Sequence, residues 1–178
     1  MDTFPQLDSP RLSLRKIQPD DLPALVKYAN NKKIADQIVN IPYPFREPQA
    51  AFRIGYVLKG FKNKTYYVFA IIHKERNELI GEVSLHLMDK HQAHGNLGYW
   101  IGEPFWNQGI ATEAIRAVIQ FGFQQLDLDL IYGDCYESNL ASQKVLTKNG
   151  MVKHAKNGRI LLLRLTRSDF DHQAEKDI

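Results

Sequence analysis

A glycine turn between an apolar run and an amphipathic segment constrains the fold of this chain more than any other feature. The apolar run ends at Trp100–Ile101, and the turn Asn107-Gln108-Gly109-Ile110-Ala111-Thr112 leads into residues 112–124. Apolar side chains recur there at helical spacing, on a face shared by Ala111, Ile115, Val118, Ile119 and Gly122. The sequence therefore predicts a strand that passes through a tight turn into a helix packed on a core.

Such a turn is suited to binding an anion. The start of a helix leaves about four backbone N–H groups without partners, and the helix dipole favours negative charge there. Gly109 and the small Ala111 would let a phosphate approach these donors closely. A connection that needs glycine for its backbone alone is the alternative. The Gly-Lys-Ser/Thr phosphate loop and the G-x-G-x-x-G pattern after a strand are both missing from the sequence, which argues against nucleotide hydrolysis and dinucleotide binding.

The remaining segments predict one mixed α/β (α+β) domain. Period-two or continuous apolar runs indicate strands at residues 11–17, 65–74, 78–88, 95–101, 128–136 and, as a hairpin over Asn157-Gly158, 151–167. Helical spacing indicates helices at 18–31, 47–60, 112–124 and 138–150. We therefore expect a mostly antiparallel sheet of about seven strands flanked by about four helices. Residues 1–10 are expected to be an N-terminal segment, 11–170 the domain and 171–178 a charged, mobile tail.

Composition narrows the function classes. The formal net charge is +3 and the basic residues are scattered, which is too weak a signal for nucleic acid but suits a small anionic ligand. Cys135 is the single cysteine, so an internal disulfide is excluded and a cytoplasmic location is expected. There is no run of about eighteen apolar residues and no signal peptide, so we expect no membrane association. His91 and His94 lack further ligand spacing, so no metal is expected.

Four stretches, in order, resemble the GNAT (Gcn5-related) N-acetyltransferases. The stretch "LGYWIGEPFWNQGIATEA" is similar to the acetyl-CoA motif of that family; "RLSLRKI" and "ELIGEVSL" precede it, and "NLASQKVLTKNGM" follows. The resemblance covers Arg11 to about Phe170 and is nearest to the branch of the ribosomal-protein N-terminal acetyltransferases RimJ and RimL. It implies the GNAT fold, an acetyltransferase activity, acetyl-CoA as co-substrate, and a monomer or homodimer.

The resemblance also implies which residues hold the cofactor. The segment that begins at Leu97 would pair with the pantetheine amides, and the turn amides would hold the pyrophosphate. Asn139 matches the family asparagine that binds the pantetheine arm, whereas Lys144 and Lys148 would either reach the phosphates or solvate their helix. The implied cofactor-binding residues are Leu97, Gly98, Tyr99, Trp100, Ile101, Asn107, Gln108, Gly109, Ile110, Ala111, Thr112, Asn139, Ser142 and Lys144.

Acetyl transfer to an amine needs a proton acceptor and a hydrogen-bond donor for the departing thiolate. Many GNAT proteins use a glutamate and a tyrosine, but the matching positions here are Asn96 and Leu146. The RimL-like scheme uses a glutamate in the turn and a serine in the later helix, which match Glu103 and Ser142. We therefore predict Glu103 as base, directly or through water, and Ser142 as the thiolate-side donor. The alternatives are an exposed turn glutamate and a helix-surface hydroxyl.

Glu82 is the rival base. Strand alternation places Glu82, Ser84, His86 and Met88 on one face of their strand. That polar face would either line the acceptor cleft or, as is common in an antiparallel sheet, face solvent; of the two we favour solvent.

The acceptor walls are expected from the irregular segment 40–48, where Tyr43 and Phe45 would stack on substrate or simply pack. At neutral pH, deprotonating a lysine amine costs about 4 kcal/mol and an α-amine about 1 kcal/mol. A site with a weakened base therefore favours a peptide or protein N-terminus. A small-molecule amine (polyamine or aminoglycoside) and a non-catalytic acetyl-CoA-binding module are the alternatives.

Overall fold

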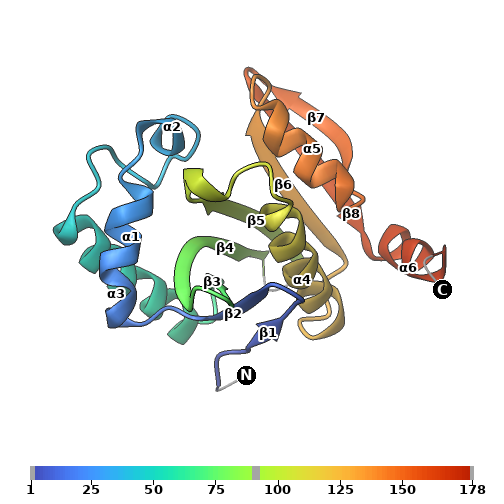
Figure 1. Cartoon of the computed structure of the whole chain (residues 1–178). Coiled ribbons are helices and arrows are strands. Elements are labelled where there is room, and N and C mark those ends of the chain that lie inside the picture. The colour runs from blue at the N-terminus through green and yellow to red at the C-terminus, as the bar shows by residue number, and fades with distance from the viewer. Residues whose placement is uncertain (1–2, 90–92, 177–178) are drawn as a thin grey trace.

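One twisted sheet runs through the chain in a computed structural model that describes residues 3–89 and 93–176 (Figure 1). Within the described residues the sheet has eight strands in the order β1-β2-β3-β4-β5-β6-β8-β7. Neighbouring strands are antiparallel except for β5 and β6, which are parallel. The strands are β1 Leu7–Asp8, β2 Leu12–Lys16, β3 Tyr66–His73, β4 Glu78–Asp89, β5 His94–Ile101, β6 Leu130–Tyr136, β7 Val152–Asn157 and β8 Ile160–Thr166.

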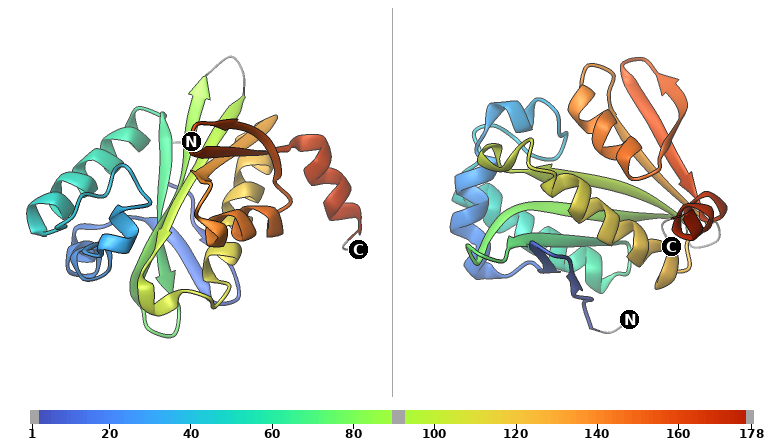
Figure 2. Two further views of the ribbon diagram at one scale, coloured as in Figure 1. Left: turned by 90° about the horizontal axis from the view of Figure 1, so that it is seen from above. Right: turned by 45° about the vertical axis from the view of Figure 1, so that its right-hand side comes forward.

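Helices cover both faces of this sheet. Those of the described chain are α1 Leu22–Ala29, α2 Lys32–Ala35, α3 Glu47–Lys62, α4 Ile110–Gln124, α5 Leu140–Lys148 and α6 Arg167–Lys176, with 3-10 turns η1 Pro19–Asp21 and η2 Glu103–Phe105. Figure 2 shows α1 and α3 on one face and α4 on the other. The helix α4 links β5 to β6, and a connection between parallel neighbours requires such a crossover.

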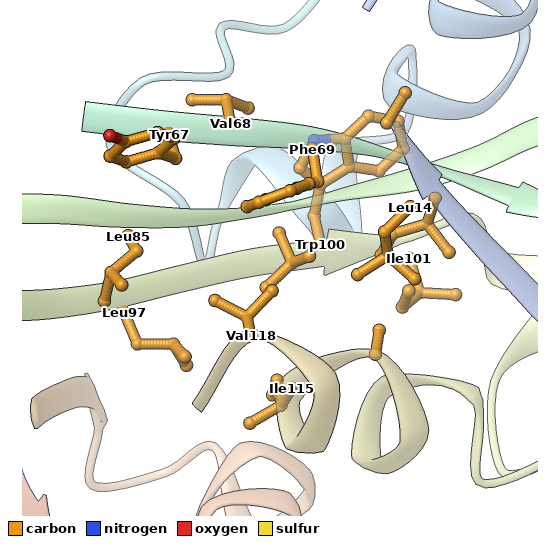
Figure 3. Close-up of a cluster of buried hydrophobic side chains, with 14 of the residues drawn as sticks. Leu14, Tyr67, Val68, Phe69, Leu85, Leu97, Trp100, Ile101, Ile115 and Val118 are labelled. Atoms are coloured by element: carbon orange, nitrogen blue, oxygen red, sulfur yellow. The ribbon is translucent and has the colours of Figure 1, made fainter. Parts of the chain in front are cut away.

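The core fills the layer between α4 and the sheet. Alternation directs Val83, Leu85 and Leu97 to this side, and all three are buried. The side chains of Ile115 and Val118 lie on α4, on the same side of the sheet as Leu85 and Leu97 (Figure 3). The helical spacing at the end of the glycine turn therefore predicted the packed face correctly. Helix and sheet are fixed against each other here, which places the start of α4 beside the end of β5.

The sheet opens between β5 and β6. The two strands pair from His94 opposite Leu130 to Leu97 opposite Gly133, and β5 then continues to Ile101 while β6 continues to Tyr136 in register with β8 alone. From Gly98 onward, the edge of β5 that faces β6 pairs with no strand in the described part of the chain. The result is a V-shaped gap in the middle of the sheet, flanked by the start of α4 and by α5 (Figure 1).

The predicted fold class is confirmed, with more elements than expected. The strand β1 lies in the expected N-terminal segment and pairs with β2, so this segment extends the sheet. The helix α6 extends through most of the expected tail, because Phe170 stacks on Phe123 at 4.9 Å and anchors an otherwise polar helix. The one-turn helix α2 was too short to give a periodic signal. Within the described chain, none of the helices combines the length and the apolarity that crossing a membrane requires.

Candidate active site

A cavity of about 940 Å³ occupies the V between β5 and β6. One arm is lined by α5 and the glycine turn, and the other by α3, β4 and the residues after α1. The volume lies at the upper end of the range typical of small-molecule sites. The predicted cofactor strand lines it from Leu97 to Ile101, and its free backbone edge supplies amide donors and acceptors.

The glycine turn forms the rim of the first arm. Asn107 (φ 59°) and Gly109 (φ 75°) both have left-handed backbone conformations, and α4 begins directly afterwards at Ile110, two residues earlier than predicted. Asn107 and the segment Gly109–Thr112 line the cavity. Gln108 does not; its side-chain amide donates to the Pro104 carbonyl at 2.8 Å. The exposed turn and the free N–H groups of the first turn of α4 therefore face the cavity together.

A network beneath the turn holds it in place. The Arg11 guanidinium donates from Nη1 to the Gln108 carbonyl (2.8 Å) and from Nε to Glu113 Oε2 (2.7 Å). Glu113 Oε1 also accepts from the Ser9 hydroxyl (2.7 Å) and the Arg11 backbone N–H (2.9 Å). Burial alone would raise the pKa of Glu113, but these bonds from Ser9 and Arg11 outweigh it and lower the pKa below its usual value. Glu113 therefore stays charged and anchors the turn to the N-terminal strands.

The wall opposite the turn comes from α5. Asn139 caps this helix through Oδ1, which accepts from the Ser142 backbone N–H at 3.0 Å. Ser142 is buried, and its Oγ accepts a hydrogen bond from the Tyr99 hydroxyl at 2.9 Å. Burial raises the pKa of Tyr99 to about 12, so the phenol stays a donor at neutral pH. Lys144 and Lys148 are exposed on the same helix. Like Tyr99, Asn139 and Ser142, they line the cavity.

Glu82 is buried, and the prediction that it faces solvent is wrong. Its side chain lies under α3, which covers this face of the sheet, and Oε2 accepts from Arg53 Nε (2.6 Å), Arg53 Nη2 (2.5 Å) and Trp100 Nε1 (2.7 Å). Its second oxygen, Oε1, is buried and has no hydrogen-bond partner among the described residues. The buried ion pair joins α3 to β4 at the floor of the second arm of the cavity.

Ser84 and His86 follow on the same face and also line the cavity. The Ser84 hydroxyl donates to the Gly98 carbonyl at 3.2 Å. The His86 ring packs against Tyr66, with the ring centroids 5.0 Å apart. Burial and the positive charge of Arg53 lower the pKa of His86 below its usual value, so its imidazole is neutral at neutral pH. The strand β4 thus presents a polar floor that becomes more exposed toward Met88, which lies at the surface.

Glu103 lies outside the cavity lining. Its carboxylate, on η2, accepts from Asn31 Nδ2 at 2.6 Å and pairs with the ammonium of Lys33. The hydrogen bonds from Lys33 and Asn31 lower the pKa of Glu103 below its usual value. The structure therefore does not bring Glu103 together with Ser142, and instead places it as a brace between η2 and the start of α2.

The acceptor walls differ from those expected. Tyr43 is exposed and outside the cavity lining, and Phe45 is buried and contributes to a separate hollow of about 440 Å³. The cavity is lined instead by residues 33–40, just upstream, and by Arg53 and Tyr56 of α3. The irregular segment reaches the cavity only at Asn40, and of the two roles left open for Phe45 the structure supports packing.

The cysteine and the histidines that the sequence analysis weighed as a buried thiol and as metal ligands have ordinary packing environments where the structure describes them. Burial raises the pKa of the Cys135 thiol even though the Ser142 hydroxyl opposes this, so the thiol stays protonated. His94 packs against Tyr132, with ring centroids 6.0 Å apart. His91 lies outside the described residues. No group of three or more His, Cys, Asp or Glu side chains suited to a metal occurs in the described ranges.

Comparison with known proteins identifies the family. Residues 11–152 match the family model described as the acetyltransferase (GNAT) domain. A Bacillus licheniformis protein named uncharacterized N-acetyltransferase p20 is 32% identical over 141 residues, 76% of each chain. The ribosomal-protein-serine acetyltransferase of Escherichia coli is 31% identical over 87 residues, which cover 49% of this chain and 48% of that protein.

Solved structures agree in fold. RimL, the ribosomal L7/L12 alpha-N-protein acetyltransferase in complex with coenzyme A, superimposes with a TM-score of 0.81 at 19% identity, covering 91% of this chain and 98% of the other. GNAT enzymes use acetyl-CoA and act on amine acceptors, which fits a cavity that joins a turn of free amides to a buried polar floor. The chain belongs to the GNAT family and is an acetyl-CoA-dependent N-acetyltransferase related to the ribosomal-protein acetyltransferases.

Proposed function

We propose that this enzyme acetylates the α-amino group of a peptide or protein N-terminus. One observation carries the proposal: the cavity is continuous through the V, so that the glycine turn opens into one arm and the polar floor of β4 into the other. A thioester laid along the free edge of β5 would meet an amine at the point where the strands separate. The relationship to ribosomal-protein acetyltransferases supports a polypeptide acceptor.

The residues of the first arm fit acetyl-CoA, which supplies the activated acetyl group. The amides of Gly109–Thr112 would bind the pyrophosphate, and the free edge of β5 from Gly98 onward would hydrogen-bond the pantetheine. Lys144 and Lys148 add positive charge on the opposite wall. Hydrogen bonds to charged groups contribute about 1.5–3 kcal/mol each, so three or four at the turn would supply much of the roughly 8 kcal/mol behind a micromolar affinity.

Ser142 takes the thiolate-side role that the sequence predicted. The Tyr99 hydroxyl donates to Ser142 Oγ, so Ser142 keeps its own proton to donate, either to the neighbouring Cys135 thiol or to an incoming sulfur. A donor placed where charge develops lowers the barrier without reorganisation at the moment of reaction. Because the Tyr99 phenol keeps its proton to about pH 12, the chain of two hydroxyls keeps its direction across the physiological range.

The unpartnered oxygen of Glu82 supports a peptide acceptor. A buried acceptor without a donor costs about 1–3 kcal/mol, which a ligand N–H can offset. A peptide supplies amide N–H groups beyond its terminal amine, so Glu82 Oε1 would receive one of them while the amine lies elsewhere on the floor of the cavity. On this assignment Glu82 positions the acceptor, and its pairing with Arg53 keeps it from acting as a free base.

The cost of deprotonation disfavours the small-molecule alternative. The α-amine costs about 3 kcal/mol less to deprotonate at neutral pH than a lysine-type amine such as those of a polyamine. Charge in the acceptor arm does not separate the two classes, because the cations that line it, Lys33 and Arg53, are paired with Glu103 and Glu82.

The test is CoA release with acetyl-CoA and a panel of acceptors at neutral pH. Peptides with a free N-terminus are expected to react fastest. The matched control is the same peptide with its N-terminus blocked and one internal lysine free, which we expect to react at least tenfold more slowly. Faster turnover of a polyamine or an aminoglycoside than of every free-terminus peptide would overturn the proposed acceptor.

A further inference from the structure

Three polar side chains from three adjacent strands form a row at the vertex of the V. His86 of β4 is the direct cross-strand partner of Asn96 of β5, and Asn96 Nδ2 donates to Asp134 Oδ1 of β6 at 3.2 Å. Asn96 precedes the last paired residue of β5, and Asp134 follows the last paired residue of β6. All three line the cavity. The row therefore lies where the free edge of β5 begins.

We propose that His86 is the catalytic base that takes the proton from the acceptor amine. This inference rests on the proposed function. Directly opposed residues of an antiparallel pair share one face, with Cβ atoms about 4.5–5.5 Å apart. An imidazole on β4 therefore lies beside Asn96 of β5, where the free edge of β5 begins.

The other candidates are occupied or unsuited. Glu103 lies outside the cavity lining and is bound to Asn31 and Lys33. Glu82 is paired with Arg53 and bonded to Trp100. The Asn96 amide cannot take up a proton at neutral pH. An unperturbed imidazole is a stronger base than an unperturbed carboxylate by about 2 pKa units, and the lowered pKa of His86 reduces that margin.

The surroundings of His86 keep its imidazole neutral. Burial is the larger cause of its lowered pKa and the charge of Arg53 the second. The Tyr66 ring packs on the imidazole from β3. The titratable and charged groups that line the cavity from the elements around it include Arg53 and Tyr56 of α3, Glu82 of β4 and Asp134 of β6, and Tyr66 of β3 packs on the ring itself. A neutral imidazole that lines the cavity is free to accept a proton at the pH at which an α-amine is already partly deprotonated.

The acceptor ammonium gives one proton to a ring nitrogen of His86, which releases it to solvent and becomes neutral again. The neutral amine nitrogen then attacks the thioester carbonyl carbon and forms the C–N bond, and its second proton leaves through His86 to solvent. The C–S bond breaks with its electron pair on sulfur, where the Ser142 hydroxyl donates a hydrogen bond, and the thiolate takes up one proton from solvent. The products are the N-acetyl peptide, CoA as its thiol and one proton for each ammonium consumed.

The test compares His86→Gln with His154→Gln, a control on β7 that is exposed and outside the cavity lining. We measure kcat against pH with both substrates saturating. The wild type is expected to show an acid limb below pH 6.5. His86→Gln should lose about 10²–10⁴-fold in kcat and lose that limb, with the KM for acetyl-CoA unchanged. Added imidazole should restore part of the rate, and the control should behave like the wild type.

Two further measurements make the result decisive. Acceptor peptides with α-amines of different pKa identify the source of the limb, since a limb that moves with the acceptor belongs to the substrate and would count against His86. An NMR titration of the wild-type imidazole, independent of turnover and of any variant, should give a pKa below 6.5; a value above 7 would overturn the proposal.

The outcomes also separate the two proposals. If the wild type acetylates a peptide and His86→Gln retains kcat within threefold with the same acid limb, the assignment of the base is wrong and the acceptor assignment stands. If the wild type acetylates only small amines, the acceptor assignment is wrong, and the variant is compared on those amines. If the wild type acetylates no amine at all, both are wrong.

Discussion

The Arg11 guanidinium holds the Gln108 carbonyl at 2.8 Å although the two residues are 97 positions apart in the sequence. Arg11 Nε also donates a hydrogen bond to the carboxylate of Glu113, so one side chain connects the turn before α4 to the first turn of α4 itself. Because that carbonyl points down to Arg11, away from the cavity, the amides that follow it are presented to a ligand. The N-terminal strands thus set the geometry of the cofactor site.

Arg11→Met should weaken acetyl-CoA binding without removing any atom from the cavity lining. We expect the dissociation constant for acetyl-CoA to rise about tenfold, in line with about 1.4 kcal/mol per decade. Isothermal titration measures it. Arg15→Met is the matched control, since Arg15 lies on β2, which begins directly after Arg11, and pairs with Asp21, away from the turn. It should lower thermal stability and leave the affinity unchanged; equal affinities for both variants would contradict this role of Arg11.

Gly109→Glu should abolish cofactor binding. The substitution adds a negative charge beside the expected pyrophosphate, forces a non-glycine residue to φ 75°, and brings its Cβ to 3.4 Å from Arg11 Nη2, the side chain that holds the turn. Gly158→Glu controls for the strain of a non-glycine residue at positive φ. Gly158 has φ 57° in the hairpin between β7 and β8, with open space around it. Fluorescence or calorimetric titration with acetyl-CoA should detect binding in the Gly158 variant only. Normal affinity in Gly109→Glu would refute the anion-binding role of the turn.

Local patterns in the sequence predicted the elements of the site, while the contacts between distant elements stayed hidden. Alternation along β4 correctly grouped Glu82, Ser84 and His86, yet it could not say which face α3 would cover. The exposure of Glu82 was therefore predicted wrongly. Glu113 gave no signal, because its partners Ser9 and Arg11 are more than a hundred positions away.

The resemblance to the family indicated which positions belong to the site better than it indicated what surrounds each side chain. It placed Asn139 and Ser142 at the cavity, where the structure has them. It also implied Glu103 as the base. The surroundings of Glu103 depend on Lys33, which lies 70 positions upstream and outside the four stretches that resemble the family. The Tyr99–Ser142 hydrogen bond could be found only once the gap between β5 and β6 was known, since it joins two elements across that gap.

The pair Tyr99 and Ser142 should act as one donor unit. Ser142→Ala is expected to lower kcat about 10- to 100-fold and Tyr99→Phe about tenfold, with the double variant no worse than Ser142→Ala alone, because the phenol acts through the serine. Because burial raises the pKa of Tyr99 to about 12, the phenol contributes no alkaline limb to kcat below pH 10. Steady-state kinetics of the three variants from pH 6 to 10 test this; additive losses would show that the two hydroxyls act separately.

His86 should also affect stability in mild acid. Its pKa in the folded protein is lowered from 6.5, so the folded state binds fewer protons than the unfolded state as the pH falls through 6.5. Stability associated with this group is therefore complete above pH 6.5 and declines below it. Denaturant unfolding at pH 7.5 and 5.5 should show a smaller loss for His86→Gln than for the wild type. A loss of the same size in both would indicate that the folded-state pKa of His86 is not lowered.

Glu103→Gln separates the role suggested by the family from the one supported by the structure. If Glu103 is only a brace between η2 and α2, kcat of Glu103→Gln should stay within about threefold of the wild type. The hydrogen bond from Asn31 survives with an amide, and only the ion pair with Lys33 is lost. A base predicts a loss of about 10²-fold or more. Lys33→Met is the matched partner, because it breaks the same pair from the other side. Equal, small effects of the two variants on the KM for the acceptor, with kcat retained, would identify the brace. A loss of about 10²-fold in kcat in Glu103→Gln but not in Lys33→Met would identify Glu103 as the catalytic base in place of His86.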